Sequence, residues 1–140
     1  MDIKTTVILF RHGSYEEQSL DEEGRKQASE ACSSLSAQGF IPTIILSSPV
    51  DRAMETAKVA EEMFHAPLYP AYDLADYNPD KLLSMIQDGE CTLMVGHAPS
   101  LAEFANLLLG RQEVQKLDKG QFCIITFTEE PGFGRGTLVK

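Results

Sequence analysis

The sequence has 140 residues, the length of one ordinary domain, and we expect a single domain spanning residues 1–140. Hydrophobic residues make up 43% of the chain and charged residues 24%, which excludes disordered and fibrous classes. Twelve basic residues against 21 acidic ones give a net charge of −9, so the surface repels nucleic acid and anionic membranes. We therefore expect neither as a partner.

The cysteines and the N-terminal residues indicate a cytoplasmic protein. Cys32, Cys91 and Cys123 have no spacing typical of a disulfide framework or a zinc site. The first apolar run covers only residues 7–10, too few for a signal peptide. No apolar stretch approaches the roughly 18 residues of a membrane span.

Short apolar runs alternate with helical patterns along the chain. Residues 7–10 are continuously apolar, which is typical of a strand covered on both faces. In chain order, the patterns predict a strand at 7–10, a helix at 21–37, a strand at 44–46, a helix from Pro49 to Phe64 with Ser48 as N-cap, a strand at 68–70, a helix from Asn78 to near Gly89, a strand at 92–95, a helix from Pro99 to Gly110, and strands at 122–128 and 137–139. This alternation implies right-handed crossovers and an α/β fold with a mostly parallel central sheet.

Unusual residues follow three of the predicted strands. Arg11, His12 and Gly13 follow the first strand, Arg52 lies in the helix after the second, and His97 follows the fourth. In such folds ligands bind beyond the carboxyl ends of the strands, so we expect these side chains to meet at one edge of the sheet. Guanidinium groups and helix N-termini favour an anion there, and phosphate is the obvious dianion. Each short motif alone is weak, but together they predict a phosphate site.

These motifs resemble those of the histidine phosphatase superfamily, also called the phosphoglycerate-mutase-like family. Its first motif is similar to Phe10-Arg11-His12-Gly13, its second to Ser47-Ser48-Pro49, Arg52-Ala53 and Thr56-Ala57, and its third to Gly96-His97, Pro99 and Leu101. The resemblance covers about residues 6–108. The short chain is similar to the SixA branch, the small bacterial phosphohistidine phosphatases. This resemblance implies a three-layer α/β/α sandwich without a large lid.

The resemblance also implies a mechanism. His12 would attack phosphorus to form a phosphohistidine, from which water releases phosphate. Arg11, Arg52 and His97 would bind the phosphoryl oxygens, with Gly13 and Gln18 as further phosphate-binding residues. Gln18 stands where SixA-like proteins often carry an arginine, and it lacks the charge. No metal or other cofactor is implied.

A general acid is harder to predict. Larger members of the family use a carboxylic acid to protonate the leaving group, and Asp73 and Asp76 follow the third strand. Two solvated loop carboxylates would explain these residues equally well. An imidazole leaving group does not need such an acid, because its conjugate acid has a pKa near 6.5.

Three functions therefore stay open at this point. The first is a phosphatase for a phosphohistidine-bearing protein, such as a response regulator or a histidine-containing phosphotransfer domain, as the SixA resemblance implies. The second is a small-metabolite phosphatase with Asp73 or Asp76 as acid. The third is a non-catalytic phosphate-binding module, although phosphate binding alone would not need a nucleophile at His12.

Overall fold

A six-stranded sheet forms the middle layer of the molecule, whose computed structural model describes residues 2–140. Its strands are β1 (Thr5–Arg11), β4 (Ile44–Ser47), β5 (Leu68–Pro70), β6 (Cys91–Gly96), β7 (Phe122–Phe127) and β8 (Thr137–Leu138). Their order is β5-β4-β6-β1-β7-β8. The first four strands in this order are parallel, whereas β7 runs antiparallel to β1, and β8 antiparallel to β7. The prediction of a mostly parallel sheet is confirmed.

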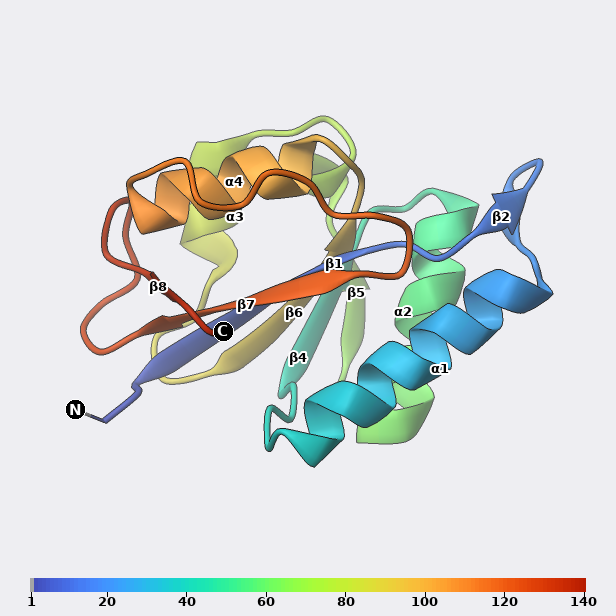
Figure 1. Cartoon of the computed structure of the whole chain (residues 1–140), viewed down its shortest axis with the longest axis horizontal. Coiled ribbons are helices and arrows are strands. Elements are labelled where there is room, and N and C mark those ends of the chain that lie inside the picture. Colours follow the sequence, from blue (N-terminus) through green and yellow to red (C-terminus); the bar gives the residue numbers. More distant parts are fainter. Residues whose placement is uncertain (1) are drawn as a thin grey trace.

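Helices cover both faces of this sheet (Figure 1). They are α1 (Glu22–Ala37), α2 (Asp51–Phe64), the short 3₁₀ helix η1 (Tyr72–Leu74), α3 (Pro79–Met85) and α4 (Ser100–Leu109). Helices α1 and α2 pack on the face that buries Ile8 and Phe10, while η1, α3 and α4 pack on the face that buries Val7 and Leu9. Because successive side chains of β1 enter opposite cores, the whole strand is apolar. The predicted three-layer α/β/α sandwich is confirmed.

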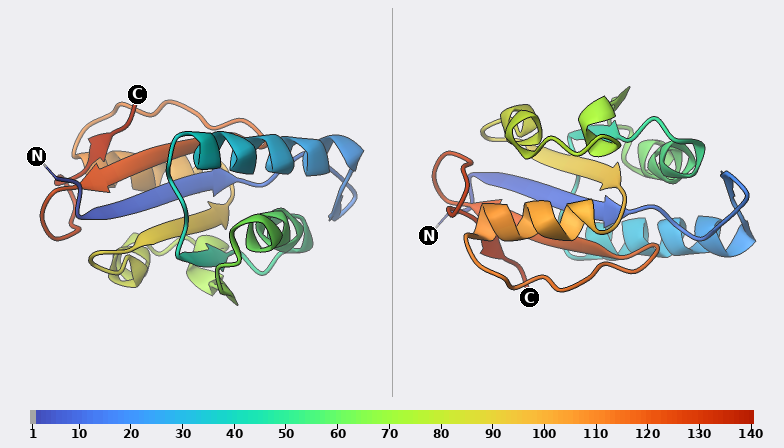
Figure 2. Two further views of the ribbon diagram at one scale, coloured as in Figure 1. Left: turned by 90° about the horizontal axis from the view of Figure 1, so that it is seen from below. Right: turned by 90° about the horizontal axis from the view of Figure 1, so that it is seen from above.

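A small hairpin that the sequence patterns did not predict follows β1. It consists of β2 (Tyr15–Glu16) and β3 (Ser19–Leu20), and both views of Figure 2 show it projecting past the carboxyl end of β1. Its two-residue strands are too short for an alternating pattern to be recognised. The backbone N–H of Leu20 donates to Oε1 of Glu55 at 2.8 Å, which ties the hairpin to α2.

One predicted helix start is wrong. Helix α2 begins at Asp51 after the N-cap Val50, and no side chain caps it, so Pro49 does not open the helix and Ser48 is not its N-cap. Ser48 is fully buried, and its Oγ lies 2.8 Å from Nε2 of His97. The side chain of Ser48 thus bonds to His97 at the edge of the sheet and does not cap a helix.

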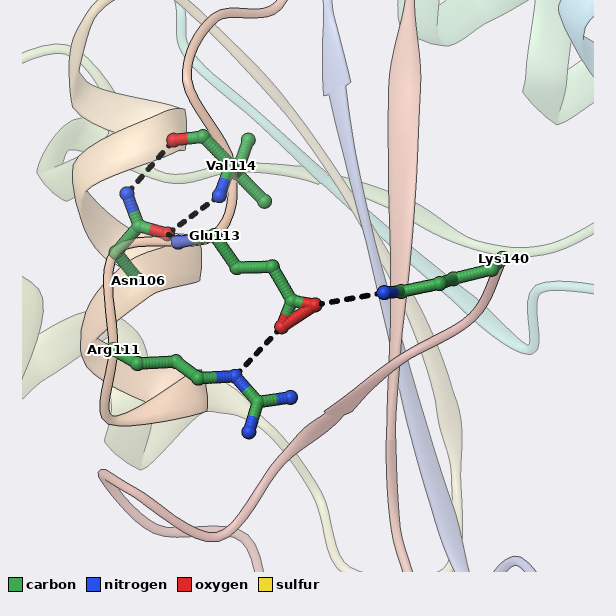
Figure 3. Close-up of polar contacts among 5 residues, drawn as sticks. All are labelled: Asn106, Arg111, Glu113, Val114 and Lys140. Atoms are coloured by element: carbon green, nitrogen blue, oxygen red, sulfur yellow. Dashed lines mark hydrogen bonds and ion pairs between the residues drawn. The ribbon is translucent and has the colours of Figure 1, made fainter.

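A buried asparagine organises the chain after α4. Asn106 is only 7% exposed, and its amide accepts from the backbone N–H groups of Glu113 and Val114 and donates to the carbonyl of Val114. The carboxylate of Glu113 in turn pairs with Arg111 and Lys140 (Figure 3). These contacts fix the start of the long segment from residue 111 to 121, which returns to the carboxyl end of β1.

We predict that Asn106→Ala lowers the free energy of unfolding by about 3 kcal/mol, because three half-buried backbone groups lose their partner. Chemical denaturation at neutral pH measures this loss. Gln112→Ala is the control, since exposed Gln112 makes a single bond to the same amide, at 3.2 Å, and should cost under about 1 kcal/mol. Equal losses in the two variants would contradict the role of Asn106.

In the part of the chain that the structure describes, no helix has both the length and the apolar character needed to cross a membrane.

Candidate active site

Three segments meet at the carboxyl ends of β1, β4 and β6, as the sequence predicted. The backbone N–H of His12 donates to the carbonyl of Gly96 at 3.1 Å, and that of Ser48 donates to the carbonyl of Val95 at 3.0 Å. These bonds continue the sheet one residue past its strands. They bring His12, Arg52 and His97, which are far apart in the sequence, to one edge.

His12 is held in one tautomer. The residue is 3% exposed, and Nδ1 lies 2.9 Å from the carbonyl oxygen of Gly13. A carbonyl oxygen only accepts hydrogen bonds, so Nδ1 carries the ring proton. Nε2 is therefore unprotonated, and its lone pair accepts a hydrogen bond from Nε of Arg52 at 3.3 Å. This is the arrangement that a nucleophilic imidazole needs.

The ring of His97 lies beside that of His12. Their centroids are 5.2 Å apart and the ring planes meet at 62°. Nε2 of His97 is bonded to Oγ of Ser48, as described above. The hydroxyl of the neighbouring Ser47, also fully buried, donates to the carbonyl of Ser48. The strand end after β4 thus fixes the orientation of the second imidazole.

Two arginines supply positive charge without acidic partners. Nη1 of Arg11 donates to the carbonyl of Leu117 at 3.0 Å, whereas its Nε is buried and has no partner within residues 2–140. Neither Arg11 nor Arg52 forms an ion pair with any residue in that range. In a protein of net charge −9, two unneutralised guanidinium groups beside two histidines make a site for an anion.

Glycines allow the segment that carries His12 to lie against α1. A Cβ on Gly13 would lie 2.6 Å from the carbonyl oxygen of Gly24, and one on Gly24 would lie 2.0 Å from that of Ser14. The backbone N–H of Gly13 donates to Oγ1 of Thr56 at 3.1 Å. This N–H already has a partner, so phosphate binding by Gly13 stays a prediction.

The hairpin adds Tyr15, a residue that the sequence analysis did not single out. Its ring meets that of His12 edge-on at 5.3 Å, and the guanidinium carbon of Arg52 lies 4.6 Å from its centroid. Nζ of Lys119, from the segment before β7, lies 4.9 Å from the same centroid. The hint in the sequence was an aromatic residue three positions after His12, but no periodicity marks it.

The remaining predicted residues form no hydrogen bond with His12 in the part of the chain that the structure describes. Gln18 is exposed in the turn of the hairpin. Asp73 lies half-buried in η1, and Asp76 is exposed just after it. Across residues 2–140, no hydrogen bond or ion pair joins any of these three side chains to the site. Their roles stay predictions.

Both histidines are neutral at pH 7. Burial lowers the pKa of His12 to about 4, with His97, Arg52 and Arg11 contributing in the same direction against the bond to Gly13. Burial also lowers the pKa of His97, as do Arg52 and Arg11. The cations and the burial of the ring therefore keep Nε2 of His12 unprotonated well below neutral pH.

We predict that the His12 imidazole titrates near pH 4 rather than 6.5, with Nδ1 protonated and Nε2 bare above that pH. Nitrogen-15 NMR of the free protein measures both, and the signal is assigned by its loss in His12→Ala. The unfolded chain takes up this proton near pH 6.5, so the free energy of unfolding should fall as the pH drops from 6.5 towards 4. A titration midpoint at or above 6.5 would contradict the burial argument.

Nowhere in residues 2–140 do three or more His, Cys, Asp or Glu side chains group as metal ligands.

Comparison with known proteins bears on the family and the fold of the chain. The sequence profile described as histidine phosphatase superfamily (branch 1) matches residues 7–90. No curated protein matches the chain in sequence at a significant level. Solved structures match over almost the full chain, although at identities that establish the fold alone.

A protein assigned as the phosphohistidine phosphatase SixA from Agrobacterium tumefaciens has a TM-score of 0.81 and 16% identity, with 99% of this chain and 98% of that chain covered. The protein histidine phosphatase SixA complexed with tungstate has a TM-score of 0.80 and 17% identity, with 96% and 94% covered. Phosphoserine phosphatase from Entamoeba histolytica, in complex with 3-phosphoglyceric acid, has a TM-score of 0.73 and 16% identity, with 97% and 95% covered. With the profile matching more than half of its residues, the chain belongs to the histidine phosphatase superfamily.

Proposed function

We propose that the protein is a phosphatase that transfers a phosphoryl group to Nε2 of His12 and then to water. The observation that carries this proposal is the bond from Nδ1 of His12 to the carbonyl of Gly13. It leaves Nε2 unprotonated, as the acceptor of a hydrogen bond from Nε of Arg52, in a ring whose pKa lies far below 7. We further propose that residues 1–140 act as one histidine phosphatase domain.

The chemistry proceeds in two displacements. Nε2 attacks phosphorus, the bond to the leaving group breaks, and the leaving atom keeps the electron pair. An imidazole whose other nitrogen is protonated leaves as a neutral molecule, whereas an alkoxide takes a proton from an acid or from solvent. Water then attacks phosphorus, the bond to Nε2 breaks, and the ring recovers its lone pair while the water proton passes to phosphate or solvent. Arg11 and Arg52 offset the charge on the equatorial oxygens in both steps. His97, whose ring lies beside that of His12, would be a further donor to these oxygens when it is protonated.

The proposed substrate is phosphohistidine on a protein domain. Only eight residues, 71–78, connect β5 with α3, so this connection is too short to form a lid over the site. No carboxylate bonds to His12 among the described residues, and an imidazole leaving group needs none because its conjugate acid has a pKa near 6.5. The fold similarity to SixA structures supports the same choice. We propose that the protein acts in the cytoplasm, without a metal ion.

The test is phosphate release from a phosphohistidine-bearing protein, run beside a panel of small phosphate esters and beside His12→Ala. We expect release from the protein at a kcat/KM at least tenfold above that of any ester, and none in the variant. A tenfold preference for esters would reject the phosphohistidine assignment. Phosphate release from neither substrate would reject the phosphatase.

A small-metabolite phosphatase is the second candidate, and the half-buried position of Asp73 in η1 favours it. For this candidate, an Asp73→Asn, Asp76→Asn double variant should lose about 10²-fold or more in kcat on alkyl phosphates, as expected for removal of a general acid. Under the phosphohistidine assignment, the double variant should keep its rate on phosphohistidine within about threefold. Steady-state kinetics on both substrates separates the two.

A further inference from the structure

Lys119 is a cation that the motifs of the site do not include. It lies in the segment between α4 and β7, about twenty residues past His97 along the chain. Nζ lies 4.9 Å from the centroid of the Tyr15 ring, and that centroid lies 5.3 Å from the His12 ring. The distance from the ammonium to the centroid of the His12 ring therefore cannot exceed the sum of these two distances.

The backbone beside Lys119 is fixed to the backbone of the site. The N–H of Gly120 donates to the carbonyls of both Arg11 and His12, and the N–H of Arg11 donates to the carbonyl of Gln121. Gly120 has a φ of +77°, and a Cβ there would lie 2.7 Å from the side chain of Gln27. This turn therefore requires a glycine. The turn fixes the position of the Lys119 backbone relative to that of His12.

The charge of Lys119 is not neutralised by the protein. Within residues 2–140 its ammonium forms no ion pair. Asp21 feels its charge, but one oxygen of that carboxylate accepts from the N–H of Gly24 and the other from Oγ of Ser14. Lys119 is thus an unpaired cation in a protein with a net charge of −9.

Two positively charged side chains, those of Arg52 and Lys119, lie over the aromatic ring of Tyr15. Arg52 lies 4.6 Å and Lys119 4.9 Å from the Tyr15 centroid. The ring attracts each cation, but the two cations repel one another unless an anion lies between or beside them. Arg52 already donates to the nitrogen that the reaction uses, so an anion at His12 would lie beside Arg52 and would attract the ammonium of Lys119.

We propose that Lys119 binds a non-bridging oxygen of the phosphoryl group, with Tyr15 positioning both Lys119 and Arg52 for it. This inference names a binding residue of the site assigned above, and so it rests on the proposed function. Gln18, on the hairpin, is exposed and carries no charge. Lys119, which comes much later in the chain, supplies a positive charge instead. It binds substrate and takes no part in the transfer of the phosphoryl group.

The test uses inorganic phosphate as the probe and calorimetric titration of the whole chain. We expect Lys119→Gln to weaken phosphate binding roughly tenfold, the size of one charge-assisted hydrogen bond, and Lys119→Arg to stay within about threefold of wild type. Lys58→Gln is the matched control, because it removes the same charge from an exposed position on α2 and should leave binding unchanged. Raised salt should narrow the difference between wild type and Lys119→Gln.

Turnover gives the second readout. Lys119→Gln should raise KM for the phosphorylated substrate about tenfold and change kcat less than about threefold. Phosphate binding by Lys119→Gln that equals wild type, in a folded protein, would overturn the inference, and so would a wild-type chain that binds no phosphate. If wild type binds phosphate through Lys119 but shows no His12-dependent release, the inference stands and the proposed function fails.

Discussion

Replacing His12 with alanine should lower kcat for phosphate release by about 10⁴-fold or more, while the protein stays folded. The variant removes the nucleophile and leaves the arginines and His97 in place, so phosphate still binds. Wild type quenched in alkali during turnover should carry acid-labile phosphate on the protein, and the variant should carry none. Stopped assays with labelled substrate measure both quantities.

The control for this experiment is His65→Asn. His65 is exposed and ends α2 with a φ of 53°, a conformation that asparagine adopts readily, so the control should keep wild-type activity. If folded His12→Ala keeps more than a tenth of wild-type kcat, the covalent route through His12 is wrong.

Gly24→Ala should be strongly destabilising, although alanine usually stabilises a helix relative to glycine. The new Cβ would lie 2.0 Å from the carbonyl oxygen of Ser14 and 2.9 Å from Cδ2 of Leu20. Backbone has to move to relieve this contact, and the moving segment is the one that carries His12. We expect a loss of about 3 kcal/mol in the free energy of unfolding and a fall of about 10²-fold in kcat/KM.

Denaturation curves and steady-state kinetics measure these two effects. Ser33→Ala, at an exposed position of the same helix, is the control and should change neither by much. Activity that survives intact in Gly24→Ala would show that the contact between α1 and the first loop does not set the position of His12.

The layers and the site were predictable because both depend on simple patterns. Apolar runs such as residues 7–10 identify buried strands, and the residues that follow them identify the reactive edge. The structure brings His12, Arg52 and His97 together as this argument requires. The carboxyl ends of neighbouring parallel strands lie at the same edge of the sheet, so the positions of these residues along the chain were enough to predict that they meet.

The rest depends on tertiary contacts that leave no pattern. Ser48 has the residue type and place of a helix cap, but burial beside His97 gives it another partner. Tyr15 and Lys119 lie on a two-residue strand and an irregular segment, where no periodicity applies. The structure shows their common location, which the distance between them in the sequence concealed.

The strand order has a consequence for how the chain folds during synthesis. β1 emerges from the ribosome first, yet it lies between β6 and β7, which follow it by more than eighty and more than one hundred residues. At ordinary translation rates of about 5–20 residues per second, its apolar side chains wait for seconds without either neighbour. Such non-local pairing slows folding, and it leaves the apolar side chains and the unpaired backbone of β1 exposed in the meantime. We therefore expect β1 to lack its complete set of neighbours until Phe127 has left the ribosome.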